Sequence, residues 1–283
     1  MPMTDGSPPI SVPAGVPALL RDLIHERTGI FFDPDRFDTM LDKLQPRAAA
    51  CGCRSYLDYY YILKYEEQAP DEWLRVMDAF SVQETYFWRE PGQIQALVQA
   101  IVPAWFATQS APLRIWSDAC ATGEEPCSLA IALAEAGWGA HPISIEASDA
   151  SEAALAKARA GVYRERSFRA LPPALRAKYF EPAGDGSRLC RERLPSIAFH
   201  RANIIARPEI AALATAPVVF CRNVFIYFSP DAIRRAVGSF AAFMPAGGYL
   251  FLGASESLLK LTTDFEIQEL ADAFVYVRKP RGV

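Results

Sequence analysis

The chain has 283 residues, of which 51% are hydrophobic and 22% are charged, and its formal net charge is -4. These values are ordinary for a soluble globular protein, and they exclude the overall basic field that would recruit nucleic acid. No run of about 18 apolar residues and no signal-like N-terminal segment is found, so we expect a cytoplasmic protein without membrane insertion.

Six cysteines and three histidines are present, but no cysteines form a CxxC pair, and His25, His141 and His200 stand alone. Structural zinc needs several ligands that converge with short local spacings. We therefore expect no metal, and we expect the cysteines to be reduced and mostly buried.

The first part of the chain is predicted to be helical. Residues 1–14 are rich in Pro, Gly and Ser, which predicts a disordered tail. Over residues 15–85, apolar side chains recur at helical spacing without any strand signal, which predicts a small all-helical domain. Within this domain, Gly29 is placed to end the first helix and Ser55 to cap a later one.

The rest of the chain, residues 86–283, is predicted to be a doubly wound α/β domain, because short β-rich runs alternate with alanine-rich helical segments. The β-rich runs are Leu113 to Trp116, Ile143 to Ala147, Ile197 to Phe199, Val218 to Cys221 and Tyr249 to Leu252. Phe265 to Val277 predicts a final antiparallel hairpin joined across Asp272. Such a hairpin on a parallel sheet is typical of the methyltransferase variant of this fold, and not of the nicotinamide-binding variant. The stretch from Glu181 to Pro195 interrupts this alternation of strand and helix signals, which predicts an insertion.

The segment from Trp116 to Ser128 leaves a strand, turns on small residues and enters a helix. A doubly wound fold receives a nucleotide-like ligand at this place. A pyrophosphate would need a glycine-rich turn, whereas only Gly123 is present and Glu124 and Glu125 occupy the anion position. Two carboxylates instead suit a ligand with an ammonium and a sulfonium group. The alternative is that Thr122 and Glu125 only form a capping box.

Asp149 follows the second strand of the predicted sheet. An acidic residue at this place can accept hydrogen bonds from both ribose hydroxyls of an adenosine-containing ligand. The alternative is a helix N-cap, because Ser148, Asp149 and Ser151 all precede the helix that begins near Ala153.

Two loop segments also carry candidate site residues. Ser81 to Pro91 joins the two predicted domains with polar side chains and three consecutive aromatics, where a plain linker would carry Gly, Ser and Pro. Its alternative role is to pack aromatic side chains between the domains. Arg222, Asn223 and Tyr227 follow a strand and lie in a loop at the ligand-binding edge of the sheet, although each could be an ordinary surface group.

Taken together in their order along the chain, these four segments resemble the CheR-type protein-glutamate O-methyltransferases, which modify chemotaxis receptors. The matching words are ETYFWREP, the strand-plus-ATGEEP turn, the ASD element, GVYRERSF, ANII, FCRNVFIYF and GGYLFLGASESL. The similarity covers roughly residues 20–280, and the motifs in combination are much more specific than any one alone.

The resemblance implies a class I S-adenosylmethionine-dependent methyltransferase sheet with a C-terminal antiparallel hairpin, preceded by a small all-helical domain. It implies a small β-subdomain inserted near residues 178–200. The implied methyl donor is S-adenosyl-L-methionine, the implied product is S-adenosyl-L-homocysteine, and no metal is implied.

The resemblance also assigns residues to the donor. Gln83, Thr85 and Arg89 would reach the donor or the methylation centre, although Gln83 stands where the family commonly has Asn. Glu125 would hold the ammonium group, and Asp149 the ribose. Further implied contacts are Asn203 and Ile204 beside the adenine, and Arg222 and Asn223 along the pocket.

Arg89 and Tyr227 would lie closest to the methyl group. A glutamate carboxylate with an ordinary pKa of about 4.3 is already an anion at neutral pH, so the reaction requires no general base. The chain accordingly has no obvious His–carboxylate or Cys–His constellation. We hypothesise that Arg89 orients the acceptor carboxylate and that Tyr227 positions the methyl group.

The implied partner is the cytoplasmic helical bundle of a methyl-accepting chemoreceptor, which the family meets with a basic helix. The corresponding stretch is mixed in charge, with Arg36, Lys43 and Arg47 beside Asp35, Asp38 and Asp42. This indicates either a receptor with a different charge pattern or an ordinary solvated helix face. Pro46 should break or end this helix.

Some family members bind a peptide tether at the receptor's C-terminus through the β-subdomain. The loop around Gly184 and Gly186 looks short here, so we expect no C-terminal pentapeptide tether. We also expect a monomer. The alternative functions are a methyltransferase that acts on another acceptor, and a non-catalytic scaffold that binds the donor or its product.

Overall fold

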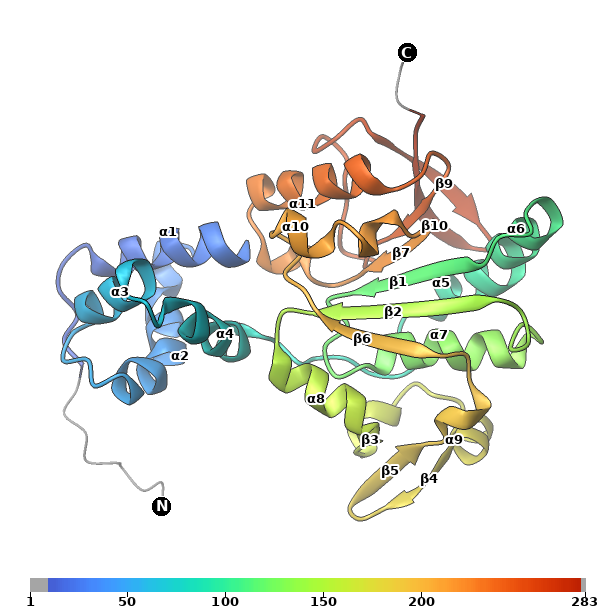
Figure 1. Ribbon diagram of the computed structural model, residues 1–283, viewed down its shortest axis with the longest axis horizontal. Helices are drawn as coiled ribbons and strands as arrows, with labels where there is room; N and C mark the ends of the chain where they lie inside the picture. Colours follow the sequence, from blue (N-terminus) through green and yellow to red (C-terminus); the bar gives the residue numbers. More distant parts are fainter. Residues whose placement is uncertain (1–9, 281–283) are drawn as a thin grey trace.

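The computed structural model describes residues 10–280 and shows two bodies joined by residues 81–90 (Figure 1). The smaller body, at the left of Figure 1, is entirely helical. The larger body is an α/β structure whose parallel strands point toward the helical body. None of the helices in the described part is long and apolar enough to cross a membrane.

The helical body consists of α1 (Val16–Thr28), the 3-10 turn η1 (Pro34–Arg36), α2 (Phe37–Ala50), α3 (Tyr56–Tyr65) and α4 (Ala69–Phe80). Their apolar faces meet in one core. Gly29 ends α1 in the left-handed conformation, as predicted. Ser55 caps α3 as predicted, in a capping box that it forms with Asp58.

Pro46 does not break α2, contrary to the prediction. The helix continues to Ala50 with the proline in its interior. A proline at this position frees the carbonyl group of the residue four places earlier, which is Asp42. Asp42 and Pro46 are both exposed, so water can bind the freed carbonyl, while Leu44 and Ala48 keep the helix anchored in the core.

Residues 1–14 are the predicted disordered tail, and residues 1–9 of this tail lie outside the described residues. Its last part is ordered, contrary to the prediction. The Ser11 amide donates to the carbonyl oxygen of Arg54 at 3.0 Å, and the Ser11 carbonyl accepts from the amide of Tyr56 at 2.9 Å. Pairing with a loop so distant in the sequence leaves no periodic signal, so composition could not predict it.

The larger body contains a seven-stranded sheet of order β6-β2-β1-β7-β8-β10-β9. The strands are β1 (Leu113–Asp118), β2 (Ile143–Asp149), β6 (Ile197–Arg201), β7 (Val218–Cys221), β8 (Tyr249–Phe251), β9 (Phe265–Leu270) and β10 (Ala273–Arg278). Neighbouring strands among β6, β2, β1, β7 and β8 pair in parallel. β10 pairs antiparallel with both β8 and β9. The predicted doubly wound sheet with a C-terminal hairpin is therefore confirmed.

Helices cover both faces of this sheet (Figure 1). One face carries α5 (Pro91–Ala96), the π-helical η2 (Leu97–Ile101), α6 (Val102–Thr108) and α7 (Glu124–Glu135), and the other α10 (Arg207–Ile210) and α11 (Pro230–Phe243). α8 (Glu152–Ala160) lies against β2 and β6. Side chains alternate between the faces, so Val218 and Phe220 join one core and Val219 and Cys221 the other.

Between α8 and β6 the chain forms a three-stranded sheet of order β3-β5-β4. Its elements are β3 (Val162–Tyr163), α9 (Pro173–Tyr179), β4 (Phe180–Ala183) and β5 (Gly186–Leu189). The β-subdomain thus begins before the predicted range of 178–200 and ends before Ile197, which starts β6. The prediction missed β3 because a two-residue strand has no sequence period, and tertiary packing of the Tyr163 ring fixes its place.

Direct contacts hold the helical body against the sheet edge. The amide of Phe31 donates to the carbonyl oxygen of Tyr227 at 3.0 Å. The carboxylate of Asp78 accepts a hydrogen bond from the hydroxyl of Ser151 at 2.6 Å. Because Tyr227 and Ser151 both follow strands of the main sheet, the helical body forms one wall of any site at this edge.

Gly29 sets how closely the two bodies approach. Its φ is 77°, and a Cβ on it would lie 2.8 Å from a ring carbon of Phe228 and 2.9 Å from the side chain of Ile205. Gly29→Ala is expected to lower the free energy of unfolding by about 2 kcal/mol or more, measured by chemical denaturation. Gly52→Ala is the matched control, because Gly52 has a φ of 72° but open space around it. Equal losses in the two variants would show that the contact at Gly29 is not tight.

Candidate active site

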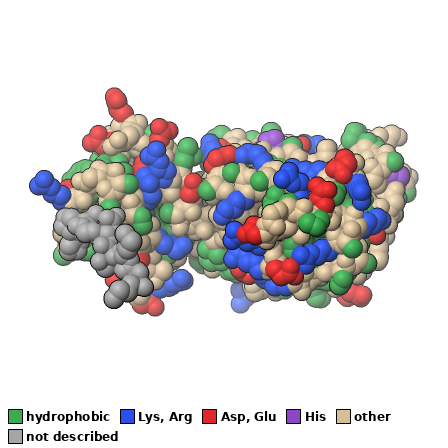
Figure 2. Space-filling view, turned by 90° about the horizontal axis from the view of Figure 1, so that it is seen from below, with side chains coloured by type: hydrophobic (Ala, Val, Ile, Leu, Met, Phe, Trp, Pro, Cys, Tyr) green, Lys and Arg blue, Asp and Glu red, His purple; other side chains and the backbone are tan. Residues whose placement is uncertain are grey.

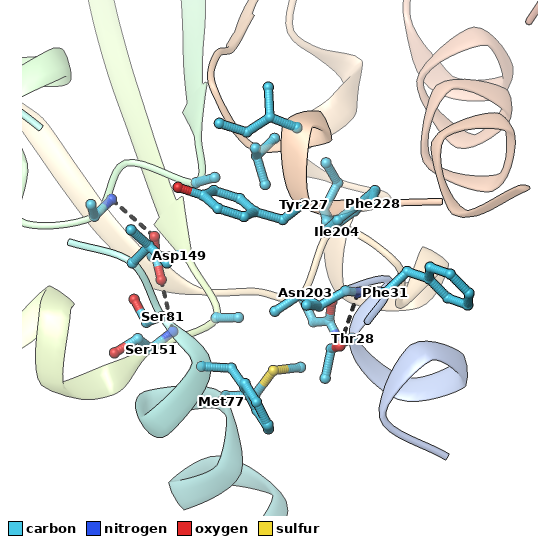
Figure 3. A pocket seen from close by; sticks show the side chains of 18 of the residues that line it. Thr28, Phe31, Met77, Ser81, Asp149, Ser151, Asn203, Ile204, Tyr227 and Phe228 are labelled. Carbon is cyan, nitrogen blue, oxygen red and sulfur yellow. Dashed lines mark hydrogen bonds between the residues drawn. The ribbon is translucent and has the colours of Figure 1, made fainter. Parts of the chain in front are cut away.

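Two adjoining cavities lie where the strands of the main sheet end, with volumes of about 310 Å³ and about 50 Å³. They share Val82, Ala119, Ala121 and Asn223 in their walls. In the larger cavity, side chains of the helical body face side chains of the α/β body across the space (Figure 3). The site therefore lies at the joint between the two bodies.

The turn after β1 has an unusual backbone. Ala119 and Ala121 have φ values of 52° and 48°, and Gly123 has a φ of 90°. Left-handed alanines are strained, and such strain concentrates at functional sites. A Cβ on Gly123 would lie 2.9 Å from the side chain of Ala158, so only glycine lets the turn pack against α8.

The capping box considered for Thr122 and Glu125 is not formed, because Gly123 is the N-cap of α7. The hydroxyl of Thr122 instead donates to the carboxylate of Glu124 at 2.6 Å. Glu125 lines the smaller cavity, and its carboxylate accepts from the hydroxyl of Ser117 at 2.7 Å. Glu125 is thus available to a ligand and does not cap the helix.

Glu125 is paired with a buried arginine. The guanidinium of Arg222 donates to Glu125 at 3.1 Å and to the carbonyl oxygen of Arg89 at 2.7 Å, and it lies 3.3 Å from the carboxylate of Glu90. Burial raises the pKa of Glu125, and the charge of Arg222 acts in the opposite direction. One cation shared by two carboxylates leaves the cluster net negative, which suits a cationic ligand group.

Asp149 is almost buried at the end of β2 and lines the larger cavity. Its carboxylate accepts from the amides of Ala121 at 2.9 Å and Ser151 at 2.8 Å (Figure 3). The N-cap of α8 is Ser151 and not Asp149, because the Ser151 hydroxyl accepts from the amide of Ala154 at 3.1 Å. A carboxylate can accept about four hydrogen bonds, so Asp149 can still bind two ribose hydroxyls.

Asn203 and Ile204 follow β6 and line the same cavity. The side-chain amide of Asn203 donates to the carbonyl oxygen of Arg27 at 2.7 Å, and its oxygen accepts from the amide of Ile205 at 3.1 Å. Asn203 therefore ties this loop to the end of α1. Ile204 is buried and contributes apolar surface of the kind that a planar base packs against.

Side chains of the segment from Ser81 to Pro91 have different surroundings: some pack in the core and others line the cavities. Phe87 is fully buried and stacks on Phe168, so the packing alternative holds for this ring. Thr85 and Arg89 line the smaller cavity. Gln83 lines neither cavity, and its side-chain oxygen accepts from the ammonium of Lys157 at 2.7 Å.

Tyr227 and Asn223 come from the loop after β7. Tyr227 closes the 3-10 turn η6 (Phe225–Tyr227), and its ring faces the larger cavity (Figure 3). Asn223 has a φ of 61°, and its amide donates to the carboxylate of Glu256 at 2.8 Å. Glu256 also accepts from the amides of Phe225 and Gly253, so it holds the loop in place.

Four buried polar atoms lack a hydrogen-bond partner among the described residues: Oε1 of Gln93, Oδ2 of Asp118, Nε of Arg222, and Oε2 of Glu90, which is held only by its ion pair with Arg222. All four belong to residues that line these cavities or the neighbouring groove beside β8 and β10. Unpaired buried groups are costly in free energy unless a ligand or water satisfies them. The sequence prediction missed Asp118, although a charged residue that ends an otherwise apolar strand is a signal that could have found it.

The donor set fits S-adenosylmethionine. Its ammonium and sulfonium groups are positive, and Asp118, Glu125 and Asp149 supply carboxylates in the walls of two connected cavities. Ile204 and Phe228 add apolar surface to the wall of the larger cavity, and a planar base can pack against such a surface. No cluster of three or more His, Cys, Asp or Glu side chains that could hold a metal ion occurs within residues 10–280.

The hairpin-closed parallel sheet, the acidic turn after β1 and the aspartate after β2 define a class I S-adenosylmethionine-dependent methyltransferase. Residues 83–274 match the family model described as CheR methyltransferase, SAM binding domain, and residues 18–81 match CheR methyltransferase, all-alpha domain. The chain belongs to the CheR methyltransferase family, and the resemblance stated from the motifs is confirmed.

Three relatives illustrate the similarity. Chemotaxis protein methyltransferase 2 from Vibrio cholerae is 34% identical and covers 93% of this chain and 92% of its own. Chemotaxis protein methyltransferase 1 from the same species is 35% identical and covers 72% of this chain and 75% of its own. The probable biofilm formation methyltransferase WspC from Pseudomonas putida is 31% identical and covers 90% of this chain and 60% of its own.

Proposed function

We propose that this enzyme transfers a methyl group from S-adenosylmethionine to glutamate carboxylates on the cytoplasmic helical bundle of a methyl-accepting chemoreceptor. The products would be glutamate methyl esters and S-adenosylhomocysteine. One observation carries the proposal: the cations Arg36, Lys43 and Arg89 lie in the walls of the two cavities, where the helical body contributes one carboxylate, Asp33. Cations in the walls of a site attract an anionic acceptor, and a carboxylate is such an acceptor. The names of the Vibrio cholerae relatives support the acceptor class.

The proposed donor contacts divide between the two cavities. Glu125 holds the ammonium group in the smaller cavity, and Asp149 binds the ribose in the larger one. The remaining proposed contacts are Thr85, Asn203, Ile204, Arg222 and Asn223. Gln83 would reach the donor only after leaving Lys157.

The chemistry requires orientation more than acid–base catalysis. When bound, the donor supplies a methyl group on a positively charged sulfur. The acceptor carboxylate is ionised at neutral pH, so the protein has to align it and exclude water. Alignment of two reactants can lower a barrier by roughly 7–11 kcal/mol. In this proposal Arg89 orients the carboxylate and Tyr227 positions the methyl group.

We assign residues 15–85 to an acceptor-facing domain and residues 86–283 to the methyltransferase domain. Of the three basic residues expected on the docking helix, Arg47 is unavailable because it binds the buried Glu72 at 2.7 Å. Arg36 and Lys43 both line the larger cavity. These two cations are therefore the proposed contacts of the helical domain with the acidic receptor.

The proposed enzyme acts as a monomer and without a C-terminal pentapeptide tether. The turn between β4 and β5 has only Gly184 and Asp185, and this short turn supports the absence of a tether site. Lys and Arg side chains gather on the face that carries this small sheet (Figure 2). Several of them are paired with acids: Arg164 with Asp185, Arg176 with Glu165, and Lys178 with Glu135. Such pairs are typical of a solvated surface.

The proposal predicts alkali-labile methylation. Receptor-containing membranes incubated with the enzyme and methyl-labelled S-adenosylmethionine should release volatile label in base, because methyl esters hydrolyse to methanol and N-methyl groups do not. The same mixture without membranes is the control. Label that stays non-volatile would contradict a carboxylate acceptor. No label, with S-adenosylhomocysteine still bound by the protein, would support the non-catalytic scaffold.

A further inference from the structure

The carboxylate of Glu256 binds three backbone amides from two loops. Its Oε2 accepts from the amides of Asn223 at 2.8 Å and Gly253 at 2.7 Å, and its Oε1 accepts from the amide of Phe225 at 2.7 Å. Gly253 and Glu256 follow β8, whereas Asn223 and Phe225 follow β7, the parallel neighbour of β8. One side chain therefore ties together the loops after two adjacent strands.

The loop after β7 is held in a conformation that a chain seldom adopts by itself. Asn223 has a φ of 61°, in the left-handed region that is unfavourable for residues other than glycine. A Cβ on Gly253 would collide with the side-chain amide of Asn223 and would lie 2.9 Å from its Cγ, so the two loops are in close contact. Hydrogen bonds to a carboxylate are stronger than those between neutral groups, and here they offset the backbone strain.

The bond to Phe225 connects Glu256 with Tyr227. Phe225 opens the 3-10 turn η6 and Tyr227 closes it, and the Tyr227 amide donates to the carbonyl oxygen of Val224 at 3.1 Å. The Tyr227 carbonyl in turn accepts from the amide of Phe31 in the helical body at 3.0 Å. Because the turn has only three residues, a displacement at Phe225 also displaces Tyr227.

We propose that Glu256 is a positioning residue for methyl transfer, which fixes the loop after β7 and thereby the place of the Tyr227 ring in the larger cavity. This inference rests on the proposed function and adds a residue to it. Glu256 lines neither of the two cavities, so it acts through the loop and not by contact with the donor or the acceptor. Arg222 in the same loop is held through its own side chain by Glu125 and Glu90. Loss of Glu256 therefore impairs the transfer step more than donor binding.

The test replaces Glu256 with glutamine, which keeps the size of the side chain but leaves only one acceptor oxygen. Its NH2 group then faces at least one backbone amide. In Glu256→Gln, kcat on receptor-containing membranes is expected to fall roughly tenfold, while the donor affinity in calorimetric titrations changes by less than about threefold. Asp58→Asn is the matched control. The Asp58 carboxylate also accepts from backbone amides, of Arg54 at 3.1 Å and Ser55 at 2.9 Å, but it lines neither cavity, so kcat should stay normal.

A double-mutant cycle shows whether Glu256 acts through Tyr227. In a Tyr227→Ala background, Glu256→Gln should lower kcat by less than about twofold further, because the ring that it positions is absent. An equal loss in both backgrounds would overturn the proposal, since the two residues would then act independently. Normal kcat in a folded Glu256→Gln protein would overturn it as well.

Hydrogen exchange measured by mass spectrometry follows the loop without any acceptor. Peptides that contain Asn223 and Phe225 should exchange faster in Glu256→Gln than in the unaltered protein. Unchanged exchange would overturn the role of Glu256 and leave the proposed function standing. Absence of methyl transfer by the unaltered protein would overturn the proposed function and the catalytic role of Glu256 with it, while the exchange rates still decide whether Glu256 fixes the loop.

Discussion

Replacing Arg89 with alanine is expected to lower turnover by about a hundredfold or more, while the affinity for S-adenosylmethionine changes by less than about threefold. The Arg89 guanidinium lines the smaller cavity, where it donates to the carbonyl oxygen of Glu84 at 3.2 Å and lies 5.5 Å from the ring centroid of Tyr86. These contacts leave most of its N–H donors free for a bidentate bond to an acceptor carboxylate. Methyl-transfer kinetics on receptor membranes and calorimetric titration of the donor measure the two quantities.

A neighbouring arginine provides the matched control. Arg169 stacks on the same Tyr86 ring at 3.7 Å and binds Glu84 at 2.6 Å, but it lines neither cavity. Arg169→Ala is therefore expected to keep normal turnover. Arg89→Lys keeps the charge without the planar fork and should fall between the two. Normal turnover in Arg89→Ala would remove this residue from the mechanism, and a parallel fall in donor affinity would make it a donor contact.

Replacing Arg222 with alanine is expected to lower the free energy of unfolding by about 3–5 kcal/mol and to weaken donor binding at least about tenfold. The Arg222 side chain is 2% exposed and lies between the carboxylates of Glu125 and Glu90. Without it, both carboxylates stay buried without a cation. The pKa of Glu125, which burial already raises, would rise further because the charge of Arg222 now opposes that shift. A protonated Glu125 no longer attracts an ammonium group.

Stability and donor binding can be separated with a second buried arginine. Arg278 is 5% exposed and donates to the carbonyl oxygen of Ala241 at 2.8 Å, away from both cavities. Arg278→Ala should lower the free energy of unfolding in urea but leave the donor affinity of the folded protein unchanged. Unaltered donor affinity in Arg222→Ala would show that the Glu125–Arg222 pair is a structural feature and not part of the donor site.

Much of the fold could be predicted from the sequence because its signals are local. The apolar run Val218–Cys221 is a strand with alternating faces, and the helical spacing of Trp73, Val76 and Phe80 is found in α4. The cavity in which we propose the donor site could be located for a related reason. The carboxyl ends of parallel strands meet at one edge, so residues that follow separate strands, such as Asp149 and Tyr227, line one cavity. Their roles toward the donor stay predictions.

Tertiary structure decided how these side chains pair. The sequence contained Glu125 and Arg222, but only the fold brings residues so distant in the chain within 3.1 Å. It also directs Gln83 to Lys157 and leaves Oδ2 of Asp118 without a partner among the described residues.

Local signals in the sequence were enough to predict the elements of this methyltransferase and their order, because apolar periodicity and capping residues act within a few positions. Three features could be seen only in the folded molecule: which carboxylate has a cation, that α2 continues through Pro46, and that the helical domain closes the larger cavity. Burial and charge pairing depend on neighbours that are far apart in the chain, and no local pattern records them.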